Sequence, residues 1–241
     1  MSSQLDDDIL GNALLDFLNN RHNEDENLLV TSDIGEKDLY PVHHFFRGFN
    51  DLPAAEKKAI RLCEGKILDV GAGGGVHSLI LQETGFDVTA IDISPGCVAA
   101  MNQLGVKRTL CTDFFELSPN MRFDTILLLM NGLGIVGEKE KLPLFFEKAH
   151  QLLFPGGQLL LDSSDIHYMY EEEDGSVRSD LSKSYYGEVT YQMYYNHAKG
   201  KPFTWLYMPF EELDSFARQH GFKGTLIADH DHHYLAKFTF S

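Results

Sequence analysis

The chain has 241 residues, a hydrophobic fraction of 43% and a formal net charge of −16 at pH 7. This length and hydrophobic fraction suit one enzyme-sized domain with its own core, and no stretch reaches the about 18 apolar residues that cross a membrane. Binding to phosphate backbones depends on clustered cations, so the excess of 36 Asp and Glu over 20 Lys and Arg argues against a nucleic-acid partner.

The cysteines and the first residues of the chain indicate in which cellular compartment the protein is expected. The 3 cysteines, Cys63, Cys97 and Cys111, have no close pairing, which is typical of a reducing compartment. Residues 1–8 have neither the cationic region nor the apolar run of a secretion signal. We therefore expect a cytoplasmic protein that folds without disulfides or structural metals.

Residues 1–64 precede the first predicted core strand, and we expect them to be mainly helical. Apolar residues recur at helical spacing from Ile9 to Leu18. Pro53 can begin a second helix over Ala54–Cys63. Between these helices lies Val42–Phe49, a segment rich in His and aromatic residues.

The most informative segment is Ile67–Gly75, which predicts a buried strand that ends in a glycine loop and opens a helix over Val76–Glu83. Such a loop lets a ligand approach the backbone and the free amides of the helix start. Two ligands compete, a dinucleotide and S-adenosylmethionine. The dinucleotide fingerprint G-x-G-x-x-G, counted from Gly71, would need a glycine where Val76 stands. Asp69 suits the cationic amino group of a methionine better than a pyrophosphate.

The next predicted strand, Asp87–Ser94, ends in the carboxylate of Asp92. A carboxylate about 20 residues after the glycine loop is placed to accept hydrogen bonds from both hydroxyls of a ribose. This spacing supports the fold without separating S-adenosylmethionine from NAD. Ser94 is a candidate cap for the following helix, and Pro95 is tolerated in its first turn.

Two further strands complete the predicted core. Phe123–Met130 is an almost continuous apolar run, as expected for a parallel strand covered on both faces, and it ends in Asn131-Gly132-Leu133-Gly134. Leu153–Asp162 contains a Pro-Gly-Gly turn into another strand. After it we expect an insertion at 167–208, which begins with the acidic turn 171–175.

The insertion and the C-terminal part have clear patterns. Tyr185–Tyr195 and Phe203–Met208 predict an antiparallel hairpin. A helix follows from about Pro209 to His220, with Gly221 as its C-terminal stop. Two more strands are predicted near residues 223–228 and 234–240.

Taken in this order, the segments between Gly65 and Asp162 resemble the class I (Rossmann-like) S-adenosylmethionine-dependent methyltransferases. The resemblance implies an α/β fold with a doubly wound, seven-stranded, mostly parallel sheet. It also implies a methyltransferase domain at 65–241, a helical lid at 1–64, and a β-hairpin insertion that extends the sheet or covers the site. The cofactor would be S-adenosyl-L-methionine.

The resemblance also assigns candidate binding residues, and it assigns no metal site. The glycine loop and its preceding carboxylate would hold the methionine half, and the end of the strand Asp87–Ser94 would hold the ribose. The segment Cys111–Phe114 would hold the adenine, and the end of the strand Phe123–Met130 would lie near the methyl group. In that order the candidates are Asp69, Gly71, Ala72 and Gly73; Asp92 and Ile93; Asp113 and Phe114; and Asn131 and Gly132.

Methyl transfer from a sulfonium needs mainly placement, and the sequence contains no obvious catalytic residue. His43 and His44 are candidate general bases, because His titrates near neutral pH; the alternative is that one packs and the other is solvated. Arg47 is a candidate for holding a carboxylate, and a surface ion pair is the alternative. The run 230–233, His-Asp-His-His, is better explained as an exposed turn than as a metal site.

The predicted activity is in-line methyl transfer to the O, N or C atom of a small molecule. Enzymes that methylate DNA bases or glutamine amides commonly carry Asn/Asp-Pro-Pro-aromatic where this chain has Asn131-Gly132-Leu133-Gly134. This favours a small-molecule acceptor over a protein. The alternatives are a protein that binds S-adenosylmethionine or S-adenosylhomocysteine without catalysis and, disfavoured by Val76 and Asp69, a nucleotide-dependent oxidoreductase. The oligomeric state stays open.

Overall fold

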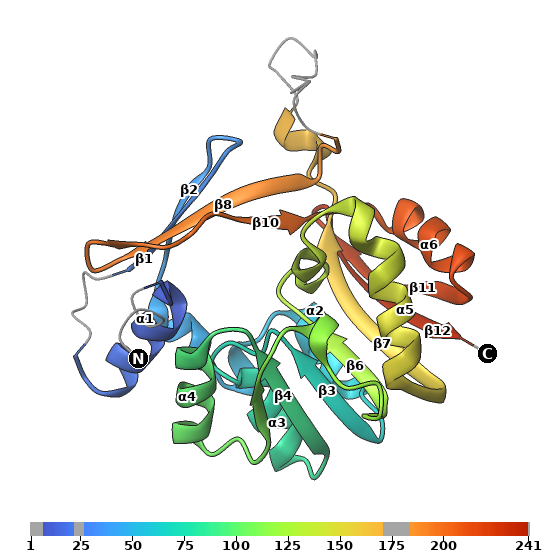
Figure 1. The fold of residues 1–241 in the computed structure, drawn as a ribbon, viewed down its shortest axis with the longest axis horizontal. Helices are drawn as coiled ribbons and strands as arrows, with labels where there is room; N and C mark the ends of the chain where they lie inside the picture. Colours follow the sequence, from blue (N-terminus) through green and yellow to red (C-terminus); the bar gives the residue numbers. More distant parts are fainter. Residues whose placement is uncertain (1–6, 22–26, 171–183, 241) are drawn as a thin grey trace.

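The structure is a computed structural model, and it describes residues 7–21, 27–170 and 184–240 (Figure 1). The predicted acidic turn at 171–175 lies outside the described residues. The described chain forms two β-sheets with helices packed around the larger one.

The larger sheet has seven strands in the order β11-β12-β7-β6-β3-β4-β5. β12 is antiparallel to both of its neighbours, and the other neighbouring pairs are parallel. This confirms the predicted doubly wound, mostly parallel sheet. Its strands are β3 (Lys66–Val70), β4 (Asp87–Asp92), β5 (Thr109–Cys111), β6 (Phe123–Leu128), β7 (Leu153–Ser164), β11 (Phe222–His230) and β12 (His233–Phe240).

Helices cover both faces of this sheet, which explains the continuous apolar runs of its central strands. In β3, Ile67 packs in the cluster that includes α2 and α3, while its neighbour Leu68 packs in the cluster that includes α5 and α6. Alternate residues of one strand therefore fill two separate cores. The helices are α2 (Ala54–Leu62), α3 (Val76–Glu83), α4 (Pro95–Leu104), α5 (Leu142–Leu152) and α6 (Phe210–Gln219).

The predicted hairpin is present but does not extend the larger sheet. β8 (Glu188–Tyr195) pairs antiparallel with β10 (Phe203–Leu206), and β8 also pairs with β1 (Leu28–Ser32) and the short β9 (Ala198–Lys199). With β2 (Lys37–Tyr40) beside β1, they form a second sheet in the order β10-β8-β1-β2. In Figure 1 this sheet arches over one edge of the larger sheet.

The N-terminal segment therefore differs from the expected helical lid. It has the predicted helices, α1 (Ile9–Leu18) and α2, but β1 and β2 lie between them, followed by the short 3₁₀ helix η1 (Val42–Phe46). The strands β1 and β2 are short; among the described strands β2 pairs only with β1, and β1 pairs on its other side with β8, which is far away in the sequence. Strand formation of this kind depends on tertiary pairing more than on local propensity. The domain boundary at 64 and 65 stays a prediction.

Asp8 fastens the N-terminal segment to the core. Its Oδ1 accepts a hydrogen bond of 3.1 Å from Gly11 N in α1, and its Oδ2 accepts one of 2.7 Å from Gly96 N in α4. Ser94 Oγ donates to the same carboxylate and accepts from Cys97 N at 2.9 Å, which confirms the predicted cap of α4. One carboxylate thus serves the N-termini of two helices, where partial positive charge favours it.

Candidate functional site

The candidate site lies at the carboxyl edge of the larger sheet, where the winding direction changes between β3 and β6. In open α/β sheets this edge is the usual ligand site. The strands β6, β3, β4 and β5 are consecutive neighbours in the sheet, so their carboxyl ends lie side by side. The predicted residues Asp69, Asp92, Asp113 and Asn131, each at or just beyond one of these ends, are thereby brought to one edge.

The glycine loop adopts backbone angles that L-residues avoid. Gly71, Gly73 and Gly75 have φ values of +67°, +54° and +80°. The loop is also tightly enclosed: a Cβ added to Gly71 would lie 2.7 Å from the Cδ1 of Ile135, and one added to Gly74 would lie 2.3 Å from the carbonyl oxygen of Phe45. At Gly73 the nearest atom would be 3.9 Å away, so the loop has room for a ligand there.

Asp92 ties the glycine loop to the end of β4. Its Oδ2 accepts a hydrogen bond of 2.9 Å from Gly73 N, and its Oδ1 accepts one of 2.9 Å from Ser94 N. Burial raises the pKa of this carboxyl above its usual range, although both hydrogen bonds act in the opposite direction. The next side chain, Ile93, is 72% exposed. An exposed apolar side chain beside a buried carboxylate suits a ligand with a sugar and an apolar ring.

Asp69 lies beneath the glycine loop. Its carboxylate is 2% exposed, and its Oδ2 accepts a hydrogen bond of 2.6 Å from Ser78 Oγ in α3. Burial raises the pKa of Asp69, although nearby His77 and the Ser78 hydrogen bonds lower it. The side chain thus supports the junction between β3 and α3, in addition to the predicted role beside the methionine half, which stays a prediction.

The predicted adenine position needs one correction. Asp113 is exposed after β5, and its Oδ1 accepts a hydrogen bond of 2.8 Å from Phe115 N. Phe114, however, is only 2% exposed, and its ring packs in the core with its centroid 5.5 Å from that of Phe145. Its ring therefore presents no face to the site, because the turn after Asp113 directs it inward. Ile93 is an exposed apolar side chain at this edge.

The segment 130–134, called the lip here, is held in an unusual backbone shape. Met130 and Asn131 have φ values of +67° and +56°. The buried carboxylate of Asp162, in β7, accepts hydrogen bonds from Met130 N at 3.1 Å and Gly132 N at 2.9 Å. Ser164 Oγ donates to Asn131 Oδ1 at 2.8 Å. Asp162 was not among the predicted site residues, although a carboxylate at the end of a buried strand is a usable signal in the sequence.

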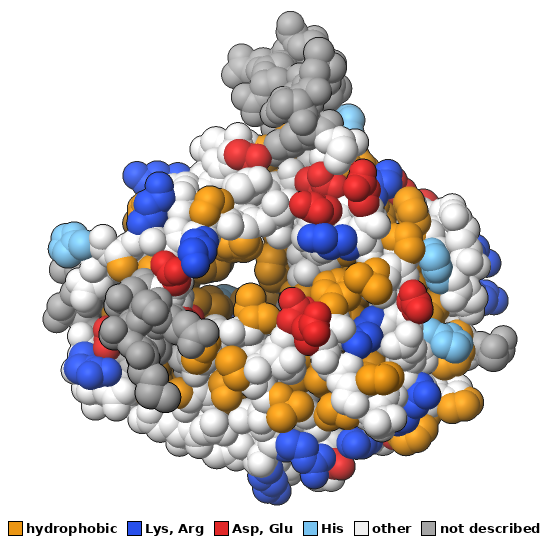
Figure 2. All heavy atoms as spheres, viewed as in Figure 1, with side chains coloured by type: hydrophobic (Ala, Val, Ile, Leu, Met, Phe, Trp, Pro, Cys, Tyr) orange, Lys and Arg blue, Asp and Glu red, His pale blue; other side chains and the backbone are white. Residues whose placement is uncertain are grey.

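The second sheet rests on the lip. Trp205 in β10 donates from Nε1 to the carbonyl oxygen of Asn131 at 2.9 Å. A Cβ on Gly134 would lie 1.8 Å from that indole nitrogen, so a glycine is required for the indole to sit there. Figure 2 shows an opening between the second sheet and the core, bordered by hydrophobic side chains. This opening, called the central opening here, lies above the carboxyl edge.

A buried group of charges lies beside the lip. Arg47 Nη2 is 3.4 Å from Glu56 Oε2, and His77 Nε2 is 2.7 Å from the same oxygen. The Arg47 side chain is 9% exposed, its Nη2 also lies 3.5 Å from Met130 Sδ, and its buried Nε has no partner in the structure. Arg47 is therefore in a buried ion pair and not in a surface one, and its Nε is a buried donor without a hydrogen-bond partner among the described residues.

The candidate bases occupy different environments. His43 is exposed, while His44 is half-buried. Burial, followed by the charge of Arg47, lowers the pKa of His44. Neither is shown to act on a substrate, so their catalytic role stays a prediction.

The predicted exposed turn is present at 230–232, where Asp231 and His232 have positive φ values. His233 is not part of this exposed turn, because its Nε2 lies 3.0 Å from Asp162 Oδ2. This hydrogen bond raises the pKa of His233. His233 therefore lies next to the carboxylate that holds the lip. In the described part of the chain, no group of His, Cys, Asp or Glu is arranged to hold a metal ion.

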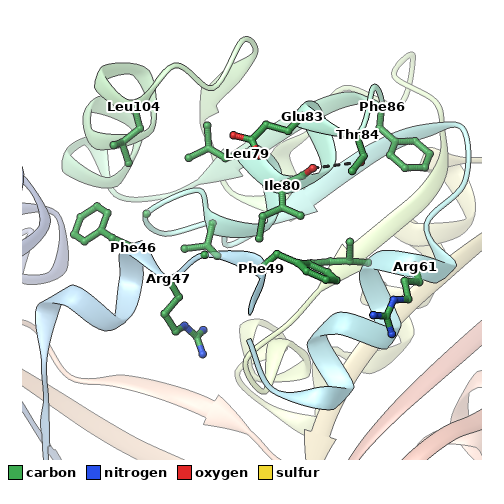
Figure 3. Close-up of a pocket in the computed structure, with 14 residues that line it drawn as sticks. Phe46, Arg47, Phe49, Arg61, Leu79, Ile80, Glu83, Thr84, Phe86 and Leu104 are labelled. Carbon is green, nitrogen blue, oxygen red and sulfur yellow. Dashed lines mark hydrogen bonds between the residues drawn. The ribbon is translucent and has the colours of Figure 1, made fainter. Parts of the chain in front are cut away.

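A hollow of about 530 Å³ lies on the other side of the glycine loop, between the N-terminal segment and α3 (Figure 3). Its walls include Phe46, Phe49, Leu79 and Ile80, and it reaches Gly74. Asp92, Asp113 and Asn131 do not line it. Arg47 also lines this hollow, which therefore adjoins the candidate site without including the residues at the strand ends.

Comparisons with known proteins agree with this geometry. A family model described as "Methyltransferase domain" matches residues 67–157. A methyltransferase of Bacteroides fragilis, solved with S-adenosyl-L-homocysteine, is 43% identical, with a TM-score of 0.90 over 98% of this chain and 96% of that one.

Two curated relatives match the core. A putative methyltransferase of Geobacillus sp. is 29% identical over 44% of this chain and 44% of that protein. An uncharacterized methyltransferase of Staphylococcus carnosus is 30% identical over 54% of this chain and 59% of that protein. The chain thus spans about half the length of these curated relatives.

The described ranges include no helix with the length and apolar character that a membrane crossing requires. The fold, the glycine loop and the full-length similarity to the Bacteroides protein agree on the family and on S-adenosylmethionine as its cofactor. The chain belongs to the class I, Rossmann-like family of S-adenosylmethionine-dependent methyltransferases.

Proposed function

We propose that this chain transfers the methyl group of S-adenosylmethionine to a small molecule bound in the central opening. The observation that carries this proposal is the hydrogen bond between Trp205 and Asn131, which seats the second sheet on the lip. A sheet in this position leaves a covered space above the carboxyl edge. Such a space suits a small acceptor better than a folded protein or a duplex, and the net charge of −16 also opposes a nucleic acid.

The donor would be held by residues at the carboxyl edge. Asp92 retains unused lone pairs for the ribose hydroxyls, and Ile93 would cover the apolar side of the nucleoside. The glycine loop at residues 71–73 would face the methionine half, and Arg47 is a candidate donor to its carboxylate. Asp113 would accept from the adenine amine.

The bound cofactor supplies a methyl group on a positively charged sulfur, with a neutral leaving group. The chain orients the acceptor and excludes water, for which the second sheet and the lip are placed. An acceptor that carries a proton also needs a base. His233 is our candidate, because Asp162 orients its ring beside the lip and raises its pKa.

Two measurements test the proposal. Calorimetry with S-adenosylhomocysteine, with NADH as a control, should give micromolar binding of the homocysteine compound alone. Transfer of a labelled methyl group from S-adenosylmethionine should then be measured with pools of amines, phenols and carboxylic acids, beside a peptide pool and duplex DNA. Label in a small-molecule pool supports the proposal. Label only in peptides or DNA would refute the acceptor class, and binding without transfer to any pool would favour a non-catalytic binding protein.

A further inference from the structure

The face of the second sheet that looks toward the core has a distinctive composition. Side chains alternate between the two faces of a strand, and directly paired residues share a face. Val30 packs with α1, so its face is the inner one, and its partner in β8 is Met193. Tyr191, two residues before Met193, is therefore also on the inner face, and its partner in β10 is Phe203.

The aromatic side chains on this inner face form a continuous row that begins at the lip. Trp205 donates to the lip carbonyl, and its ring centroid is 6.0 Å from that of Phe203. The Phe203 centroid is 5.9 Å from that of Tyr191, whose hydroxyl lies 2.8 Å from the hydroxyl of Tyr207. Half-buried rings thus extend from the point where the methyl group would be transferred.

The charges of the second sheet are divided between its two faces. Asp38 pairs with Val30 and is therefore on the inner face, where its charge adds to burial and to Tyr207 in raising the pKa of Tyr191. Lys37 pairs with Thr31, and Lys199 pairs with Tyr194, which puts both lysines on the outer face. In the described strands of this sheet, the inner face therefore has aromatic rings and an acid but no Lys or Arg.

We propose that the acceptor is a cationic amine, methylated on nitrogen, which is recognised by the aromatic rings and by Asp38 on this inner face. An ammonium group is attracted to the faces of Tyr and Trp rings and to a carboxylate, whereas a carboxylate or phosphate acceptor would be repelled. This inference rests on the proposed function and names its substrate class. It also accords with the excess of acidic residues in the chain.

The proposed methyl transfer starts from the ammonium form of the acceptor. The ammonium group gives one proton to His233, which frees the nitrogen lone pair. That pair forms the new N–C bond to the methyl carbon while the C–S bond breaks and its electron pair stays on sulfur, leaving S-adenosylhomocysteine. The product amine gains one methyl group, and the proton passes from His233 to solvent.

Trp205 makes this proposal directly measurable, because it is the only tryptophan in the chain. Its fluorescence should be titrated, in the full chain saturated with S-adenosylhomocysteine, with 2-phenylethylamine, 2-phenylethanol and 3-phenylpropionate. These probes share a ring and differ in charge. We expect the amine to bind about tenfold more tightly than either of the others, from the usual size of cation–π and charge contacts.

Variants separate recognition of charge from general damage to the sheet. Asp38→Asn and Tyr191→Leu should each lower the affinity for the amine severalfold and leave that for the alcohol nearly unchanged. Glu36→Gln, in the turn of the same hairpin, is the control and should change neither affinity. A methyl-transfer assay with the same three probes should label the amine.

Other outcomes would overturn the proposal. They are equal or tighter binding of the alcohol or the carboxylate, no response of the amine affinity to Asp38→Asn, or no binding of any probe at millimolar concentration. Calorimetry with S-adenosylhomocysteine on the same preparations distinguishes a wrong substrate class from a failure of the proposed function. If S-adenosylhomocysteine binds and the amine is not preferred, only the substrate class is wrong; if it does not bind, the proposed function fails.

Discussion

Trp205 and Asn131 connect the two sheets of the molecule. The indole Nε1 of Trp205, in the second sheet, donates a hydrogen bond of 2.9 Å to the main-chain oxygen of Asn131, at the end of β6. Asn131 is held from the other side by Ser164 Oγ at 2.8 Å. The position of the lip is thus set jointly by the larger sheet and by the sheet that covers it.

Trp205→Phe tests this connection. The variant keeps an aromatic ring and removes the hydrogen bond, so kcat/KM for the acceptor should fall about three- to tenfold, as expected for one hydrogen bond. The affinity for S-adenosylhomocysteine, measured by calorimetry, should stay within about twofold. Tyr194→Phe, on the outer face of β8, is the control. An equal loss of donor affinity would show that the second sheet supports the donor site instead.

Asp92→Ala tests the donor site. The substitution removes the acceptor of two backbone hydrogen bonds and the predicted partner of the ribose, so binding of S-adenosylhomocysteine should weaken well over tenfold. Asp87→Ala, at the exposed start of the same strand, should leave the affinity unchanged. Calorimetry measures both, and circular dichroism checks that the fold is retained. Unchanged affinity in Asp92→Ala would contradict the assignment.

Gly74→Ala tests the contact between the glycine loop and η1. The new Cβ would lie 2.3 Å from the carbonyl oxygen of Phe45, so backbone has to move, which costs about 1–3 kcal/mol in overpacked sites. We expect a lower free energy of unfolding in denaturant and weaker donor binding. The control is Gly48→Ala, where the new Cβ has no neighbour nearer than 3.6 Å. Equal stability of the two variants would argue against this close packing.

Glu56→Gln tests the buried charges through the pH dependence of stability. Burial acts to lower the pKa of His77, but the hydrogen bond to Glu56 and the nearby carboxylates outweigh it and raise the pKa above 6.5. The stability that protonated His77 contributes is therefore complete below pH 6.5 and is lost as pH rises through its higher folded-state pKa.

The Glu56 carboxyl has a lowered pKa, despite the opposing effect of burial, because of its bond to His77 and the charges of His77 and Arg47. Its contribution is present above pH 4.5 and is lost as pH falls. Both contributions are present between pH 4.5 and pH 6.5. In this range the free energy of unfolding of Glu56→Gln should therefore fall furthest below that of the wild type, on the order of 3 kcal/mol for a broken buried pair. Chemical denaturation from pH 4 to 9 measures the difference, with Glu64→Gln as the exposed control. A pH-independent difference would be evidence against the pair.

His233→Gln tests the proposed base. The bond to Asp162 raises the pKa of His233, so the neutral, proton-accepting form increases as pH rises through that pKa. The wild-type rate should follow this rise, and the variant should lose both the rise and about a hundredfold in kcat. His230→Gln, in the exposed turn, is the control. If His44→Gln removes the rise instead, the base lies in η1.

Local sequence determined the central part of the fold. The apolar runs of β3, β4 and β6 and the glycine loop before α3 are short-range patterns, and the strands and helix appear close to the predicted bounds. The family resemblance assigned Asp69, Asp92, Asp113 and Asn131, and they lie at one edge because β6, β3, β4 and β5 are neighbours in the sheet.

Tertiary structure decided what surrounds that edge. β1 forms a strand because β8 offers a partner from the other end of the chain. The burial of Phe114 depends on Phe145, and the roles of Asp162 and Trp205 depend on a lip that both contact from distant segments. Periodicity and spacing report only which residues a helix or strand presents. Which distant element packs against them is set by long-range burial and pairing, and those contacts shape the space where the acceptor would bind.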